Sequence, residues 1–353
     1  MLYELELLTL EPVKAALIFG ALLGLGFGAL AQITRFCLRR GLVGQGRDRQ
    51  QALGTWLTAL LVALIATQGA AYFGYADFSE HRFAQAGLPF AAIVLGGLAF
   101  GAGMVLTRGC ISRLTVLSAS GNLRAVFVIA TFAIVAHATL KGVLAPARVA
   151  IGAQTVDLGE AATASGWVGG PLFWSALAAI GLAAVIYRAR PRPLHIVLAA
   201  LIGLLVPVGW IGTGVLLYDE FEPIALESLS FTAPWSETLF WTVASSAIPA
   251  GFGTGLVAGV IGGAFLSAAF RGDLELSSFE TPQQTLRYIA GGGLMGFGGV
   301  LAGGCTLGAG LSGVSTLSVS ALLALGAIMV GARLTDRALA GQSTGDSSLV
   351  PAE

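Results

Sequence analysis

Residues 292–305 read GGLMGFGGVLAGGC, an apolar run rich in glycine that ends at a cysteine. Glycine weakens helices in water but is frequent in membrane helices, where it lets two backbones approach closely. Gly292 and Gly296 are four residues apart, so they share one face of a helix. This stretch therefore predicts a membrane helix that packs tightly against a neighbour and breaks at Cys305.

The same arrangement recurs elsewhere in the chain. Every cysteine follows glycines thirteen and nine residues earlier: Gly24 and Gly28 before Cys37, Gly97 and Gly101 before Cys110, and Gly292 and Gly296 before Cys305. A fourth copy has Gly251 and Gly255, with Ala264 at the cysteine position. The pattern predicts four repeat-like units, residues 12–50, 88–145, 238–268 and 286–335, although glycine-rich membrane helices also produce such matches by chance.

The composition places the chain among integral membrane proteins. Of its 353 residues, 56% are hydrophobic and 11% are charged, whereas soluble domains carry about 25% charged residues. A membrane helix needs ~20 apolar residues, and about nine stretches qualify: 13–34, 52–75, 89–106, 123–144, 171–187, 194–217, 238–268, 288–303 and 317–334. We expect an all-α membrane protein with short central re-entrant helices or loops. The zero net charge gives no indication of nucleic-acid binding.

The distribution of arginine predicts the orientation, because cytoplasmic loops are enriched in basic residues. Arginines cluster after the first span, between the fifth and sixth spans and at the last span, whereas residues 218–237 contain acidic residues and no basic one. We expect the N-terminus outside and the C-terminus in the cytoplasm of a bacterial inner (plasma) membrane. Residues 1–340 are expected to form one polytopic domain, with 341–353 a disordered cytoplasmic tail. The acidic start, with Glu4, Glu6 and Glu11, does not resemble a secretory signal.

The cysteines are expected to line a central path for a small anion. Where a helix ends and a short one begins, the new N-terminus exposes unpaired N–H groups and partial positive charge. Non-helical backbone at membrane depth is tolerated inside protein or beside a water-filled cavity. Protonated thiols there would donate weak S–H hydrogen bonds without repelling an anion. Gly109, Gly304 and Thr306 flank these thiols and are included in the candidate site.

Charged residues complete the candidate site. Cys37 and Cys110 share the pattern T-R-x-C-x-x-R, which supplies Arg35, Arg40, Arg108 and Arg113. These arginines are candidates for drawing anions toward the path, although they also suit a plain role as cytoplasmic topology determinants. His137 and Lys141 lie one helical turn apart in the fourth span and are further candidates. Lys141 lies near the end of its span, where its side chain can also reach the membrane surface.

At these residues the chain resembles the YeeE/YedE family of sulfur-transport membrane proteins, from about residue 12 to 335. The resemblance is carried by the glycine-rich helices, by Arg108-Gly109-Cys110 and by residues 303–313, GGCTLGAGLSG. It implies an hourglass-like helix bundle that takes up thiosulfate across a bacterial inner membrane. It also implies that three central cysteines, here Cys37, Cys110 and Cys305, pass the anion along by S–H···S hydrogen bonds. A separate cytoplasmic sulfur-carrier protein and membrane lipid are the expected partners.

Other readings of the same cysteines stay open. The chain would be a membrane thiol oxidoreductase or sulfurtransferase if the cysteines formed covalent intermediates, or a transporter of selenium or sulfane-sulfur species. A structural membrane subunit is a third reading. An odd number of cysteines without a C-x-x-C pair argues against a disulfide framework and a zinc site. We therefore expect a transporter rather than an enzyme, with no cofactor and no metal.

Overall fold

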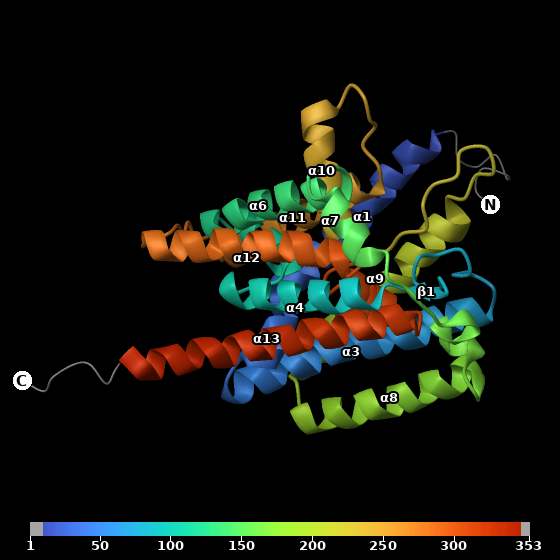
Figure 1. Cartoon of the computed structure of the whole chain (residues 1–353), viewed down its shortest axis with the longest axis horizontal. Coiled ribbons are helices and arrows are strands. Elements are labelled where there is room, and N and C mark those ends of the chain that lie inside the picture. The colour runs from blue at the N-terminus through green and yellow to red at the C-terminus, as the bar shows by residue number, and fades with distance from the viewer. Residues whose placement is uncertain (1–9, 347–353) are drawn as a thin grey trace, which may run out of the picture.

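The computed structural model describes residues 10–346, with side chains described through residue 341, and most of this part is helical. The long helices are α1 (Pro12–Thr34), α3 (Gly46–Tyr72), α4 (Phe90–Leu106), α6 (Leu123–Lys141), α8 (Gly170–Ala189), α9 (Pro193–Ile211), α11 (Phe252–Arg271), α12 (Pro282–Leu301) and α13 (Val319–Asp346). They lie roughly side by side along the longest axis of the molecule (Figure 1). The predicted all-α membrane class is confirmed.

Shorter elements fill the connections between the long helices. They are α2 (Leu38–Val43), α5 (Ile111–Ala119), α7 (Ala145–Gly152), α10 (Thr232–Ala244), the 3₁₀ turns η1 (Gly159–Ala162) and η2 (Ala164–Gly166), and the π-helical turns η3 (Gly212–Leu216) and η4 (Gly308–Gly313). The strands β1 (Gly87–Leu88) and β2 (Val156–Asp157) form one antiparallel pair.

Eight helical stretches in the described part are long and apolar enough to cross a membrane, where the sequence predicted about nine spans. The ninth long helix, α12, has 20 residues but begins with the polar residues that follow Thr281. It nevertheless lies alongside α4 and α6 within the bundle. The difference from the predicted count therefore concerns the polarity of the first turns of α12, not its place in the fold.

Two predicted boundaries differ from the structure. Residues 238–268 are not one helix, because α10 ends at Ala244 and α11 begins at Phe252, after a segment that contains Pro249 and Gly251. Proline lacks the N–H that a helix needs, and apolarity alone does not show such a break. Ala264 consequently lies inside α11 and not at a corner. At the other end, α13 runs to Asp346, into the predicted tail, and residues 347–353 lie outside the described part.

Glycines bring two pairs of helices into backbone contact. A Cβ added to Gly24 or Gly28 of α1 would lie 2.2 or 2.3 Å from the carbonyl oxygen of Leu256 or Val260 on α11. A Cβ on Gly101 of α4 would lie 2.2 Å from the carbonyl oxygen of Ile328 on α13. In both pairs the contacting residue numbers rise together, so the helices run parallel. The G-x-x-x-G motifs of the first two units thus pack against neighbouring backbones as expected.

The helix α8 forms one edge of the bundle (Figure 1). Its main helical neighbour is α3, and Ser175 is the only residue of α8 that is buried. Large apolar side chains such as Leu172, Ile180 and Tyr187 are exposed along it. An exposed apolar face of this length is what a helix in contact with lipid requires.

Candidate functional site

Each cysteine lies at a corner where a glycine-rich helix ends. Cys37 immediately precedes α2, Cys110 immediately precedes α5, and the carbonyl of Cys305 accepts a hydrogen bond from Ala309 N at 2.9 Å in the turn that leads to η4. The residue two positions before each cysteine has a left-handed backbone: φ is 51° at Arg35, 58° at Arg108 and 73° at Gly303. The predicted helix breaks are therefore present, and the same backbone reversal produces all three.

The three thiols are free and buried, with exposed fractions of 3% for Cys37, 2% for Cys110 and 0% for Cys305. Cys37 and Cys110 lie within hydrogen-bonding reach of each other, although they are far apart in the sequence. Cys110 also reaches the side chain of Thr306, which directly follows Cys305. Its sulfur lies 3.2 Å from Ser112 Oγ. The bundle thus gathers the cysteine corners at its centre, and we call these three residues the thiol cluster.

The glycines before Cys110 and Cys305 fit tight turns. A Cβ on Gly304 would lie 2.7 Å from the backbone N of Ala309, so a larger residue there would displace the turn into η4. A Cβ on Gly109 would meet side-chain atoms of Leu114 at 3.3 Å and of Arg113 at 3.9 Å. Gly308 N donates a hydrogen bond to Cys305 Sγ at 3.4 Å. A larger residue should therefore be tolerated less well at Gly304 than at Gly109.

One cavity of about 700 Å³ lies at the C-terminal ends of α1 and α11. Its lining includes Arg35, Arg40 and Arg113, so we call it the Arg113 cavity. Arg40 forms an ion pair with Asp48 and donates to the carbonyl of Arg35 at 3.0 Å, while Nη1 of Arg113 is buried without a hydrogen-bond partner. Arg113 lies close enough to Cys37 to act on it electrostatically. An anion could neutralise these guanidinium groups here.

The structure does not bring all the predicted charged residues to this cavity. Arg108 is exposed and is not among the described residues that line it. His137 Nδ1 lies 3.1 Å from Ser236 Oγ, and its ring stacks on Phe240, both on α10. Lys141 is exposed and interacts electrostatically with Glu237, also near α10. His137 and Lys141 therefore contact α10 and not the thiol cluster.

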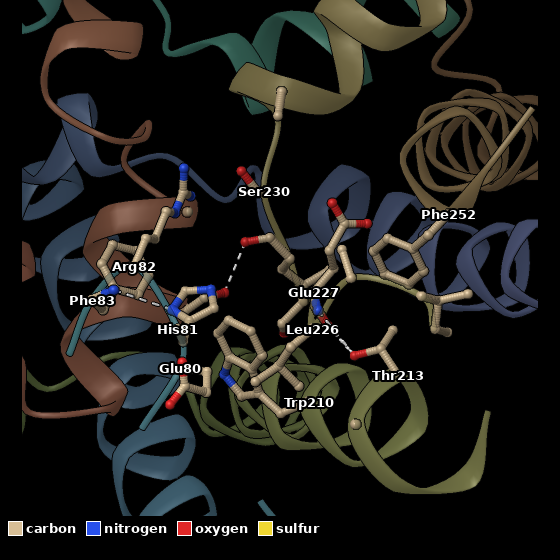
Figure 2. A pocket seen from close by; sticks show the side chains of 18 of the residues that line it. Glu80, His81, Arg82, Phe83, Trp210, Thr213, Leu226, Glu227, Ser230 and Phe252 are labelled. Atoms are coloured by element: carbon tan, nitrogen blue, oxygen red, sulfur yellow. Dashed lines mark hydrogen bonds between the residues drawn. The ribbon is translucent and has the colours of Figure 1, made fainter. Parts of the chain in front are cut away.

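A second cavity of about 700 Å³ lies at the opposite end of the bundle, and its residues were not predicted from the sequence. We call it the Arg82 cavity (Figure 2). Its lining includes His81 and Arg82 from the loop before β1, Trp210 of α9 and Glu227 of the loop before α10. Arg82 and Glu227 lie in loops between helices, and each loop contains other charged residues. No signal in one sequence separates them from their neighbours.

The thiol cluster lies between the two cavities. Gly308, which donates to Cys305, also lines the Arg82 cavity, and Arg82 interacts electrostatically with Cys305. At the other end Arg113 acts on Cys37. The contacts therefore give an order through the protein: Arg82 cavity, Cys305 with Thr306, Cys110, Cys37, Arg113 cavity. Such an arrangement is suited to moving a small anion between two aqueous ends through weak successive contacts.

Comparison with known proteins agrees with this geometry. The chain is 26% identical to the thiosulfate transporter TsuA of Escherichia coli (strain K12), over 85% of this chain and 86% of the relative. It is 27% identical to the thiosulfate transporter TsuA of Spirochaeta thermophila, over 86% of this chain and 93% of the relative. Both relatives are named as transporters, in agreement with the expectation that this chain is not an enzyme. The sulphur transport profile matches residues 33–334, so the chain belongs to the sulphur transport (YeeE/YedE) family of multi-pass membrane proteins.

Proposed function

We propose that this protein takes up thiosulfate through the thiol cluster, with the anion passing from the Arg82 cavity to the Arg113 cavity. The single observation that carries the proposal is the row of free, buried thiols joined by contacts between two cavities. The names of the two relatives support thiosulfate as the anion.

Thiols suit this task because they can solvate the anion without binding it tightly. An S–H group is a weak donor that carries no charge, so release from it is easier than from a lysine or arginine. The terminal sulfur of thiosulfate is soft and polarizable, as the cysteine sulfur is. The N-terminal end of α5 begins at Cys110 and adds unpaired backbone N–H groups at that point. Thiosulfate would therefore be relayed by successive S–H···S hydrogen bonds.

The distribution of charge supports an inward direction of transport. Among the described residues, Lys14, Arg82, Lys141 and Arg148 lie toward the end that carries the Arg82 cavity, and the other lysines and arginines lie toward the opposite end. Following the positive-inside rule, we propose that the Arg113 cavity faces the cytoplasm across a bacterial inner membrane. In this orientation the start of α1 is outside, the end of α13 is inside, and a cytoplasmic sulfur carrier would receive the anion at the Arg113 cavity.

The test is uptake of ³⁵S-labelled thiosulfate into proteoliposomes that contain the purified chain. Cys110→Ala should reduce uptake about 5- to 150-fold, since losing one hydrogen-bonding group in a buried path costs about 1–3 kcal/mol. Cys110→Ser should restore part of the rate if any donor suffices, and little of it if soft sulfur is required. Ser118→Ala on the same short helix is the control, because its hydroxyl bonds within α5 to Thr115 O at 2.7 Å.

Wild-type uptake by folded Cys110→Ala protein would refute the thiol path. Mass spectrometry of the thiols after turnover separates transport from the alternative of covalent cysteine intermediates. Unmodified cysteines are expected, whereas a persulfide or mixed disulfide would favour sulfur-transfer chemistry. Competition with unlabelled sulfate, sulfite and selenium analogues then determines the substrate preference.

A further inference from the structure

Arg82 forms no ion pair with a carboxylate within the described part of the chain. Its guanidinium carbon lies 5.1 Å from the ring centre of the adjacent Phe83, and its side chain is exposed to the Arg82 cavity. Glu227 lines the same cavity and attracts Arg82 electrostatically without contacting it. The two charged groups therefore face one water-accessible space that separates them.

Further polar groups point to a ligand in this space. The hydroxyl of Ser230 and the indole N–H of Trp210 are buried without hydrogen-bond partners, and both residues line the cavity. A buried donor without a hydrogen-bond partner destabilises the protein unless a ligand or water accepts its hydrogen bond. The backbone of Glu227 is held in place by Thr213, whose hydroxyl accepts from Glu227 N at 3.0 Å and donates to Glu227 O at 2.8 Å. The loop that carries Glu227 is therefore fixed to η3, at the end of α9.

The charges around Glu227 favour its neutral form. Burial, and to a smaller extent the carboxylate of Glu237, raises the pKa of Glu227 to about 8 against the opposing effect of Arg82. Lys141 faces Glu237 from α6, and Asp77, Glu80, His81 and Tyr218 also line the cavity. Burial lowers the pKa of His81 to about 4, so that this ring is neutral at neutral pH. Arg82 is thus the cation that an incoming anion meets.

We propose that the Arg82 cavity is an anion-binding site in which the oxyanion end of thiosulfate binds Arg82, Ser230 and Trp210 while Glu227 takes up one proton. This inference rests on the proposed function and adds to it the proton that is bound together with the anion. The ionised carboxylate of Glu227 would repel the anion and compete with it for Arg82. Protonation removes both effects, and the proton comes from the solvent on the same side. The site then holds a divalent anion together with one proton, so that binding from the outside weakens when Glu227 is ionised.

The affinity for thiosulfate should therefore fall as the pH rises. Below pH 8 Glu227 is already protonated and thiosulfate binds at full strength. Above pH 8 a proton must be taken up with each anion, so affinity should fall about tenfold per pH unit. Sulfate has four oxygens and no terminal sulfur, so it should bind this site with the same pH dependence but should not be transported through the thiols.

Isothermal titration calorimetry of the purified full chain with sodium thiosulfate tests the proposal. At pH 9, titrations in two buffers with different ionisation enthalpies should show uptake of nearly one proton per anion bound. Glu227→Gln should bind with the wild-type affinity of pH 7, keep it to pH 9 and take up no proton. Glu222→Gln, on the same loop but outside the cavity lining, is the matched control and should behave like the wild type. Arg82→Gln should weaken binding at least about tenfold at every pH.

Thiosulfate binding by the wild type without proton uptake would overturn the proposal, as would a wild-type pH profile in Glu227→Gln. The wild-type titration in two buffers gives this answer even if Glu227→Gln does not fold. Uptake of ³⁵S-thiosulfate by proteoliposomes distinguishes failure of the Glu227 proposal from failure of the thiosulfate-transport proposal. Uptake that does not weaken above pH 8 would refute the role of Glu227 alone, whereas absence of both binding and uptake would refute the transport of thiosulfate itself.

Discussion

Arg35 and Arg108 have an unusual backbone for their residue type. Both have a left-handed φ, which costs a residue with a Cβ about 1–2 kcal/mol, and the third corner has Gly303 at the equivalent position. Glycine would be the less strained choice at all three corners. An arginine there is consistent with a need for its side chain, and Arg35 lines the Arg113 cavity. The residue thus shapes the corner through its backbone and the cavity through its charge.

Replacing Arg35 by glycine separates these two contributions. Arg35→Gly should leave the thermal unfolding temperature unchanged or higher, because glycine relieves the left-handed strain. It should lower ³⁵S-thiosulfate uptake several-fold, because one cation of the Arg113 cavity is lost. Arg190→Gly is the matched control: φ is 45° at Arg190, which lies between α8 and α9 and outside both cavities. Equal loss of uptake in both variants would contradict a specific role for Arg35.

Between helices, the glycines of α1 and α11 decide how closely the bundle packs. A Cβ on Gly255, Gly259 or Gly263 of α11 would lie 2.0–2.1 Å from a carbonyl oxygen of α1. The contacts are thus reciprocal, and each backbone fills the space left by the other. The parallel pair α4 and α13 repeats the arrangement, with a Cβ on Gly331 lying 2.4 Å from the carbonyl oxygen of Leu98. These contacts hold the corners of Cys37 and Cys110 in register.

Two glycines of α1 provide a direct test of this packing. Gly28→Ala should destabilise the protein by about 1–3 kcal/mol, because its methyl group would force α1 away from Val260. Gly26→Ala should be neutral or stabilising, since its methyl group would meet only Leu205 side-chain atoms at 3.8 Å and alanine favours helix. Thermal unfolding in detergent measures both variants. Equal unfolding temperatures would show that the close α1–α11 contact contributes little.

At the scale of the whole molecule, the two cavities lie at opposite ends of one bundle and the thiol cluster lies between them. Most basic residues lie toward the end with the Arg113 cavity, and α8 presents an apolar face at the edge (Figure 1). Burial of the thiols shields them from the aqueous phases on both sides. An anion that followed the proposed path would therefore lose its water at the centre, where neutral donors would replace it.

Cysteine labelling tests the orientation that follows. In intact cells, a membrane-impermeant maleimide should label Glu222→Cys on the loop before α10. Arg190→Cys, between α8 and α9, should react only after the cells are permeabilised. Both positions are exposed, and the native thiols should stay unlabelled because they are at most 3% exposed. The reverse pattern of labelling would invert the proposed direction of transport.

Local patterns predicted the three cysteine corners but not the break between α10 and α11. A glycine-rich helix followed by T-R-x-C produced the predicted break at Cys37 and Cys110, because a left-handed residue ends a helix through its own backbone. Residues 238–268 were predicted as one span because the run is apolar, although it contains Pro249 and Gly251, where the helix breaks. Arg40 and Arg113 do meet in one cavity, whereas His137 and Lys141 turn toward α10. Spacing places a residue on a helix face but does not say which neighbour covers that face.

The sequence alone predicted the membrane class, most of the long helices and the breaks at the three cysteines. These properties depend on hydropathy and on the backbone preferences of glycine and proline, which act over a few residues. Only the tertiary structure decided that Cys37 lies against Cys110, that Thr306 reaches Cys110, and that Arg82 and Glu227 face one cavity. Each of these contacts joins segments that are far apart in the chain. Such contacts depend on the packing of whole helices, which no local sequence pattern encodes.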